Sequence, residues 1–416
     1  MTPNEFLKTL FDAAVAAADP MRVVPPNLPA PPKGRTVVIA AGKAAAAMAR
    51  AVEDNWRGPV SGIAVTRYGH GAPCDFIDVV EAGHPMPDAA GQNASARACE
   101  LVAGLTEDDL ALFLISGGGS ALLNAPATGV TLQDKQSVTR ALLVGGAPIS
   151  DINCVRKHLS AVKGGRLAAL AAPARVATLI ISDVPGDDPA TVASGPSIAD
   201  PTTLEDARAV LDKFHIKPPA AVAVLLNRPE CETPKSLPGS DTRIIVTARD
   251  ALDAAAAMAR AAGIDVIDLG DDLEGEARDL ARQHGETARG HAPALLLSGG
   301  EVTVTLGESG GKGGPNAEYA LALAIALDGC ADIHAIACDT DGIDGDGDAA
   351  GALISPQTLT RAAAAGMDPR AMLDRHDSYG FFNKLGDHVI TGPTRTNVND
   401  FRAVLIGTGG SNKIDL

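Results

Sequence analysis

The sequence predicts an α/β protein of two domains. The chain has 416 residues, of which 46% are hydrophobic, and this length corresponds to roughly two or three domains. Short β-branched runs alternate with Ala-rich stretches of helical character, which is typical of parallel strands covered by helices. A polar segment with three prolines, residues 227–240, separates two halves that share this alternation. We therefore expect an N-terminal domain over residues 1–232 and a C-terminal domain over residues 233–416.

The first half begins with an amphipathic pattern that predicts a helix over residues 4–19, followed by a stiff Pro-rich connector. Its expected strands cover residues 36–40, 62–65, 76–81, 111–115 and 177–182. The second half shows the same kind of short apolar, β-branched runs. Its expected strands cover residues 243–247, 265–269, 294–297, 302–306, 333–337 and 402–406.

Composition excludes several classes of function. A net charge of −16 argues against non-specific binding of nucleic acid and against anionic membrane surfaces, although local basic residues can still bind an anionic substrate. No apolar run approaches the roughly 20 residues that span a membrane. The N-terminus lacks the basic start of a signal peptide, so we expect a cytoplasmic protein. The six cysteines form no CxxC pair, which indicates neither a zinc site nor a disulfide framework.

Two glycine-rich loops, at 116–120 and 310–314, are the most informative local feature. A loop without Cβ atoms leaves backbone N–H groups accessible to phosphate. The first loop is not a Walker A motif, because it lacks the terminal Gly-Lys-Ser/Thr. It is not a dinucleotide fingerprint either, because Leu122 stands where the last small residue should be. A tight turn needed only for packing is the alternative. The predicted phosphate- or nucleotide-binding residues are Ser116, Gly117, Gly118, Gly119, Ser120, Lys312, Gly313, Gly314 and Asn316.

Lys43 lies where an expected strand ends and a helix begins. A lysine is unfavourable in a first helical turn, because its charge opposes the positive end of the helix dipole. Such a lysine is often paired with a bound anion. The alternative is a solvated surface lysine.

A second basic feature follows at residues 156–166, whose start has a helical pattern. Arg156, Ser160 and Lys163 would share one helical face by their spacing of three and four residues. In an acidic protein such a face can bind a carboxylate or a phosphate. A solvated face is the alternative.

Carboxylates follow two of the expected strands. Asp183 and Asp187 come after the strand at 177–182, at the end where ligands of parallel sheets bind, and oxygen ligands suit Mg²⁺ that also carries phosphates. Asx-turn chemistry is the alternative.

The run at 339–348 fails the test for a Ca²⁺-binding EF-hand loop, because Ala349 and Ser355 occupy its glycine and glutamate positions. We expect Asp341 in this run to act on a hydroxyl substrate or a metal. The polar segment 391–400 is either a further ligand loop or a turn.

Taken in order, these segments resemble the glycerate 2-kinase family, whose C-terminal part is called the MOFRL domain. The matching strings cover nearly the whole chain. They are Ala-Gly-Lys-Ala (41–44), Gly-His-Pro-Met-Pro-Asp (83–88), Ser-Gly-Gly-Gly-Ser-Ala-Leu (116–122), Val-Arg-Lys-His-Leu-Ser-x-x-Lys-Gly-Gly (155–165), Asp-Val-Pro-Gly-Asp (183–187), Leu-Ser-Gly-Gly-Glu (297–301), Gly-Lys-Gly-Gly-Pro-Asn (311–316), Asp-Thr-Asp-Gly-Ile-Asp-Gly (339–345) and Gly-Pro-Thr-Arg-Thr-Asn (392–397).

The resemblance implies a Rossmann-like N-terminal α/β domain with a mostly parallel sheet, and a C-terminal MOFRL-type α/β domain with a mixed sheet. It implies phosphorylation of D-glycerate to 2-phosphoglycerate by ATP with Mg²⁺, in the cleft between the domains. Lys43 matches the family's proposed catalytic lysine, and Pro315 stands where the family often has an arginine. The oligomeric state is open, with a homodimer as one alternative.

On this interpretation each candidate residue has a role. Lys43, Asp183 and Asp341 are catalytic, and Asp183 with Asp187 or Asp341 holds Mg²⁺. The candidate substrate-binding residues are Arg156, Lys163, Glu301 and Arg395. Two other functions stay open. Some family members are named hydroxypyruvate reductase, an activity that requires a nicotinamide cofactor, and a non-catalytic sensor of nucleotides or sugar acids would use similar loops.

Overall fold

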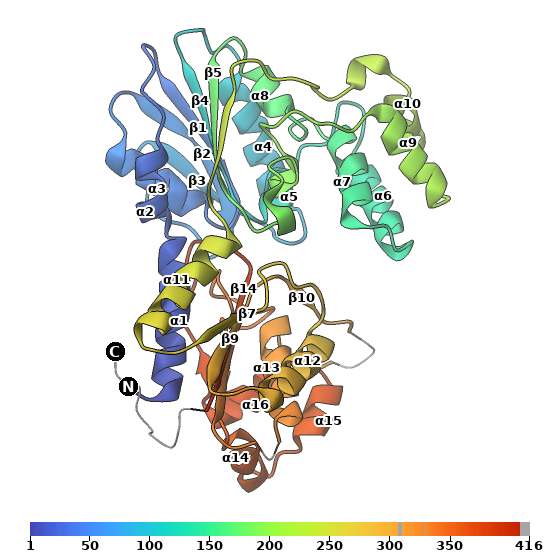
Figure 1. The fold of residues 1–416 in the computed structure, drawn as a ribbon. Coiled ribbons are helices and arrows are strands. Elements are labelled where there is room, and N and C mark those ends of the chain that lie inside the picture. Colours follow the sequence, from blue (N-terminus) through green and yellow to red (C-terminus); the bar gives the residue numbers. More distant parts are fainter. Residues whose placement is uncertain (307–309, 329, 408–416) are drawn as a thin grey trace. The chain divides into compact units, whose positions relative to one another are not determined.

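The computed structural model describes residues 1–306, 310–328 and 330–407 (Figure 1). The chain forms two compact units. Pro20–Ile245 make up the parallel-sheet unit, and Met1–Asp19 together with Val246–Leu416 make up the mixed-sheet unit. These units differ from the expected domains at two places, residues 1–19 and 233–245. The predicted α/β class is confirmed, because each unit has a six-stranded sheet with helices.

The parallel-sheet unit has the strand order β3-β2-β1-β4-β5-β6. This is the order of the Rossmann fold, in which the chain reverses direction across the sheet between β1 and β4. Every buried run predicted as a strand in the first half forms one, within one to two residues at each end. The strands are β1 (Thr36–Ala41), β2 (Val60–Arg67), β3 (Ile77–Ala82), β4 (Leu110–Ile115), β5 (Arg175–Ile181) and β6 (Asp241–Val246).

Helices of this unit form two groups (Figure 1). The first group accompanies the sheet: α2 (Pro20–Val23), α3 (Ala45–Asn55), α4 (Ala89–Val102), α5 (Gly119–Leu122) and α8 (Arg166–Leu170). The second group lies to one side of the sheet and encloses an apolar core of its own: α6 (Leu132–Val144), α7 (Ile149–His158), α9 (Leu204–Lys213) and α10 (Ala220–Leu226). Short 3₁₀ turns complete the unit at Pro25–Asn27, Pro185–Asp187, Val192–Ser194 and Pro229–Cys231.

The mixed-sheet unit has the strand order β13-β12-β11-β14-β9-β7, with β14 antiparallel to both of its neighbours. The strands are β7 (Val266–Asp268), β9 (Ala294–Ser298), β11 (Ile333–Asp339), β12 (Gly351–Ile354), β13 (His388–Val389) and β14 (Asp400–Ile406), with a separate short pair β8 (Gly275–Glu276) and β10 (Val302–Thr303). Its helices are α1 (Pro3–Ala17), α11 (Ala248–Ala261), α12 (Ala277–Gly290), α13 (Pro315–Ala326), α14 (Thr358–Ala364), α15 (Pro369–Asp374) and α16 (Ser378–Leu385).

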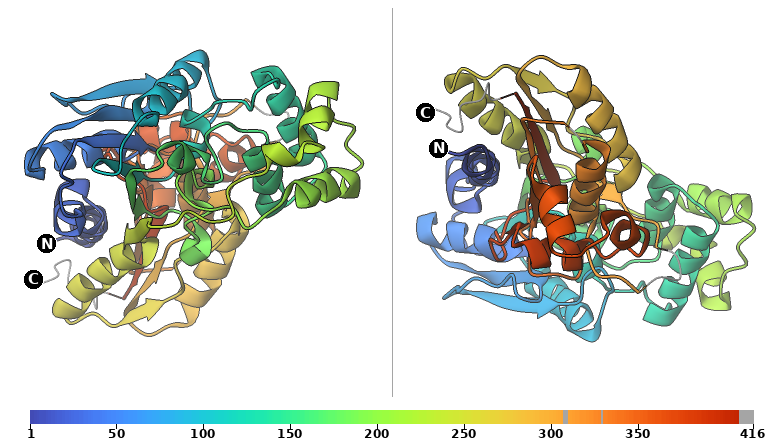
Figure 2. Two further views of the ribbon diagram at one scale, coloured as in Figure 1. Left: turned by 90° about the horizontal axis from the view of Figure 1, so that it is seen from above. Right: turned by 90° about the horizontal axis from the view of Figure 1, so that it is seen from below.

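Helix α1 explains why the N-terminus belongs with the C-terminal half. A capping box between Thr2 and Glu5 starts the helix, and its apolar face is buried. The helix packs beside α11 and against β11 and β14, as Figures 1 and 2 show from different directions. Phe11 packs against Phe401 of β14 with ring centroids 5.8 Å apart. The amphipathic pattern predicts this helix, but not the sheet that it covers.

Candidate active site

The loops that follow β1 and β4 lie side by side at the centre of the parallel sheet. The two strands pair in parallel, so their carboxyl ends meet at one edge. This is the point where the strand order reverses, and open α/β sheets bind their ligands there. Gly42 and Lys43 follow β1, and the loop 116–120 follows β4. Two motifs far apart in sequence are thus brought together.

Hydrogen bonds join the two loops directly. The Lys43 N–H donates to the Gly117 carbonyl at 2.8 Å, and the Ala44 N–H donates to Ser116 Oγ at 3.1 Å. Gly42 has φ +132°, and a Cβ there would lie 2.1 Å from Ser116 Oγ. Only glycine permits this approach. The Ser116 hydroxyl is buried and holds the loops together, so part of the glycine-rich pattern serves packing.

Lys43 lies beside Gly118 and His84. Gly118 has φ +80°, and a Cβ at this position would come within 3.0 Å of His84 Nε2 and 3.3 Å of Lys43 Cγ. The glycine therefore leaves room for a lysine and a histidine from the ends of β1 and β3. His84 belongs to one of the family-like strings, but its position beside Lys43 is visible only in the structure.

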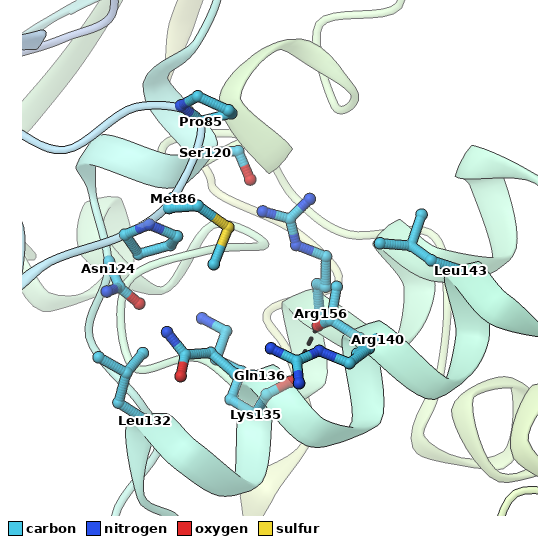
Figure 3. Close-up of a pocket in the computed structure, with 12 residues that line it drawn as sticks. Pro85, Met86, Ser120, Asn124, Leu132, Lys135, Gln136, Arg140, Leu143 and Arg156 are labelled. Carbon is cyan, nitrogen blue, oxygen red and sulfur yellow. Dashed lines mark hydrogen bonds between the residues drawn. The ribbon is translucent and has the colours of Figure 1, made fainter. Parts of the chain in front are cut away.

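A cavity of about 340 Å³ opens next to this loop (Figure 3). Ser120 and Arg156 line it, and Figure 3 shows Arg156 reaching from α7 toward Ser120. Helix α6 supplies one wall. The other lining residues are Pro85, Met86, Pro87, Asn124, Leu132, Lys135, Gln136, Thr139, Arg140 and Leu143.

The expected helical face of Arg156, Ser160 and Lys163 does not form. Helix α7 ends at His158, and Ser160 pairs with Pro126 in an isolated β-bridge. Ser160 Oγ accepts hydrogen bonds from the Val162 and Lys163 N–H groups, a side-chain turn that competes with helix continuation. Lys163 nevertheless reaches the loop, because its Nζ donates to the Ser120 carbonyl at 2.7 Å and to Ser120 Oγ at 3.1 Å.

Lys135 is a cavity residue that our sequence reasoning missed. Its side chain is only 6% exposed, and within the described part of the chain Nζ has no hydrogen-bond partner. Burial, with a smaller contribution from Arg156, lowers the pKa of Lys135 to about 7. A sequence signal exists, because the α6 residues that line the cavity follow one helical face with steps of three and four: Leu132, Lys135, Gln136, Thr139, Arg140 and Leu143.

The acidic segment after β5 is a turn, and its carboxylates differ in their hydrogen bonds and burial. Asp188 accepts hydrogen bonds from the Ala190 N–H and the Thr191 hydroxyl, so it stabilises the turn. Asp183 and Asp187 are half-buried, and Asp187 adopts a left-handed φ of +54°. Across the described ranges, no three or more His, Cys, Asp and Glu side chains gather as a metal site. Mg²⁺ bound through substrate phosphates needs only one or two protein carboxylates.

In the mixed-sheet unit, the acidic turn after β11 packs against the loop before β14. The Thr394 N–H donates to the Asp341 carbonyl at 3.0 Å, and a Cβ at Gly342 would lie 2.1 Å from the Gly392 carbonyl oxygen. Asp341 is buried, whereas Arg395 is exposed with φ +61°. Strands β9 and β11 both run antiparallel to β14, so they end at the same edge of the sheet. Glu301 follows β9 and therefore comes after a strand that ends where β11 ends.

Asp344 and Asn316 form hydrogen bonds within the mixed-sheet unit. The Asp344 carboxylate accepts hydrogen bonds from the Asn316 and Ala317 N–H groups at 3.0 and 2.8 Å, at the start of α13. Burial raises the pKa of Asp344 to about 7, against the effect of these hydrogen bonds. Asn316 Nδ2 donates to Asp400 at 2.6 Å. The Asn316 side chain thus anchors the first turn of α13.

Packing also accounts for glycines of the second loop. A Cβ at Gly313 would lie 2.2 Å from Ser378 Oγ, and one at Gly314 would lie 2.3 Å from the Asp344 carboxyl carbon. Lys312 is exposed, and its Nζ lies 4.0 Å from the ring centroid of Tyr379, a cation–π contact. Pro315 occupies the first turn of α13, where a missing N–H costs nothing.

Comparisons with known proteins agree with this architecture. The model of a family described as a domain of unknown function, DUF4147, matches residues 6–227, and that of the MOFRL family matches residues 294–400. A protein of Agrobacterium vitis provisionally named hydroxypyruvate reductase is 52% identical, over 98% of this chain and 95% of the relative. The D-glycerate 2-kinase of Thermotoga maritima is 40% identical, over 94% of this chain and 96% of the relative.

The crystal structure of a glycerate kinase from Thermotoga maritima has a TM-score of 0.87 at 39% identity, over 97% of this chain and 99% of that one. Fold and sequence thus place the protein among the α/β kinases. The chain belongs to the glycerate 2-kinase family that carries a MOFRL domain. Among the helices that the structure describes, none has both the length and the apolar character needed to cross a bilayer.

Proposed function

We propose that this protein transfers the γ-phosphoryl group of ATP to the 2-hydroxyl of D-glycerate, giving 2-phosphoglycerate. The observation that carries the proposal is the position of Lys43 and the loop 116–120 at the reversal of strand order, next to a cationic cavity. Relatives named D-glycerate 2-kinase support the choice of substrate. D-glycerate is a small anion, and such a cavity suits its carboxylate.

Phosphoryl transfer depends mainly on positioning and on neutralising the charge of the transferred group. In our proposal backbone N–H groups of the loops 116–120 and 310–314 approach the phosphates. Lys43 and Lys312 offset negative charge. Asp341 orients or accepts the proton of the glycerate hydroxyl. Arg156 binds the substrate carboxylate, and Glu301 and Arg395 are further candidates for substrate contacts.

Asp183 and Asp187 are the residues that we propose to hold Mg²⁺, with Asp341 as an alternative to Asp187. Their oxygen atoms are the ligand type that Mg²⁺ prefers, and two carboxylates leave positions for phosphate oxygens and water. Bound Mg²⁺ would neutralise charge on the phosphates. The expected location of the site, between the two domains, stays a prediction, as does the cytoplasm as its compartment.

The name of the Agrobacterium vitis relative favours a second candidate, an NAD(P)H-dependent hydroxypyruvate reductase. In a Rossmann-type sheet the nicotinamide cofactor requires a G-x-G-x-x-G loop directly after β1. Here residues 42–47 read Gly-Lys-Ala-Ala-Ala-Ala, with a single glycine. We therefore favour the kinase.

A coupled assay with ATP, Mg²⁺ and D-glycerate tests the proposal. Enolase acts on 2-phosphoglycerate, so a signal with enolase alone supports phosphorylation at the 2-position. A signal that appears only after phosphoglycerate mutase is added would indicate phosphorylation at the 3-position. Oxidation of NADH or NADPH by hydroxypyruvate, without ATP, would instead favour the reductase.

A further inference from the structure

The cavity beside Ser120 is lined by cations without a counter-charge. Lys135 and Arg140 come from α6, Arg156 comes from α7, and the described lining residues include no Asp or Glu. Lys163 is a further cation next to the cavity, because its Nζ donates hydrogen bonds to Ser120, which lines it. Like charges gathered in a partly buried cavity repel one another, so an anionic ligand would stabilise them.

The two buried lysines differ in what they bind. Lys163 is fully buried, and its Nζ already donates to both oxygen atoms of Ser120. Lys135 is 6% exposed, and its Nζ has no hydrogen-bond partner among the described residues. A buried ammonium group without a partner is costly, and native proteins usually compensate it. Lys135 therefore offers an unused charged donor in this cavity, beside Asn124, whose Nδ2 also has no hydrogen-bond partner among the described residues.

We propose that Lys135 binds the carboxylate of the acceptor substrate together with Arg156, and that the cavity selects small hydroxy acids that carry one carboxylate. This inference rests on the proposed kinase function and adds a substrate-binding residue to it. The planar guanidinium of Arg156 can bind both oxygens of a carboxylate, and Lys135 adds a point charge beside it. Gln136, Asn124 and Ser120 line the same space and offer partners to the hydroxyl groups.

Calorimetric titration with D-glycerate, without nucleotide, tests the proposal. We expect Lys135→Met to weaken binding at least tenfold and Lys135→Arg to recover part of the loss. Lys33→Met is the matched control, because Lys33 is 89% exposed in the same unit, and its affinity should stay within twofold of wild type. D-glyceramide, the neutral amide, should bind weakly to all four proteins. A thermal melt establishes that each variant is folded.

The outcomes separate this proposal from the proposed function. If the wild type phosphorylates D-glycerate and Lys135→Met keeps both its affinity and its KM, the subsite is wrong while the kinase stands. If the wild type shows no kinase activity but binds glycolate, a smaller hydroxy acid, in a Lys135-dependent manner, the subsite stands while the kinase is wrong. Failure of the wild type to bind either acid overturns the subsite.

Discussion

Lys163 Nζ lies 2.7 Å from the Ser120 carbonyl oxygen and 3.1 Å from Ser120 Oγ, although 43 residues separate the two along the chain. Ser120 Oγ also lies 2.9 Å from Ser194 Oγ. These contacts tie the end of the first glycine-rich loop to two later segments of the same unit. We infer that Lys163 acts on the candidate site through Ser120.

Replacing Lys163 should therefore disturb turnover more than substrate affinity. We expect Lys163→Met to lower kcat at least tenfold, because Ser120 and the preceding glycines lose their anchor, while KM for D-glycerate changes less than threefold. Steady-state kinetics measures both constants. A KM that rises with kcat unchanged would show that Lys163 binds the substrate itself.

Lys43 should be required for turnover but not for folding. Lys43→Ala removes a half-buried cation beside Gly118 and His84. Removal of one preorganised group that stabilises developing charge typically costs about 10²-fold or more in kcat. We expect such a loss with an unchanged melting temperature, and Lys33→Ala as a control should retain full activity. Normal activity of Lys43→Ala would refute the assignment.

Gly118 can be tested against a matched glycine. Gly118 and Gly129 have similar backbone angles, φ +80° and +88°, but only at Gly118 would a Cβ meet other side chains, those of His84 and Lys43. Both alanine variants carry the same kind of backbone strain, on the order of 1 kcal/mol. Gly118→Ala should therefore lose most activity and Gly129→Ala should keep it. Equal losses would show that strain alone is responsible.

The binding of D-glycerate should weaken as the pH rises above neutrality. Lys135 has a pKa of about 7 instead of 10.5, because burial and then Arg156 disfavour its charge. It is therefore charged below pH 7 and increasingly neutral above it, and only the charged form attracts a carboxylate. Its charged neighbours are Arg140 on α6, Arg156 on α7 and the fully buried Lys163.

Titration of D-glycerate between pH 6 and 9 checks this dependence. The affinity of the wild type should fall above pH 7, by up to about tenfold per pH unit if one proton is involved. Lys135→Arg keeps its charge throughout this range, so its affinity should stay level. The same decline in both proteins would assign the titration to another group.

The sequence predicts strands β1 and β4 to within one residue, because runs such as 36–40 and 111–115 are apolar and too short for a helix. It misses β8, β12 and β13, which are only two, four and two residues long. It also extends the helix of Arg156 too far, since the Ser160 hydroxyl bonds the backbone and ends the helical pattern. Local signals cannot show that α1 packs on a sheet formed by residues more than 200 positions away.

The candidate site, too, could be predicted only in part from the sequence. Motifs identified Lys43 and the glycine-rich loops, whereas their contact at the reversal of strand order required the topology. Lys135 went unnoticed because a single lysine in an amphipathic helix normally lies in water. Its burial depends on how α6 packs against α7 and the loop around Ser120.

A substitution of Asp341 tests whether the mixed-sheet unit contributes to catalysis. Its carboxylate is fully buried after β11, where Oδ1 accepts the Ile343 N–H at 2.8 Å. Asp341→Asn keeps the size of the side chain and removes its ability to accept a proton, so we expect kcat to fall about 10²-fold or more with a small change in the KM for ATP. Asp346 is exposed in the same turn, and Asp346→Asn should behave like wild type. A fully active Asp341→Asn variant would show that Asp341 is not the catalytic base.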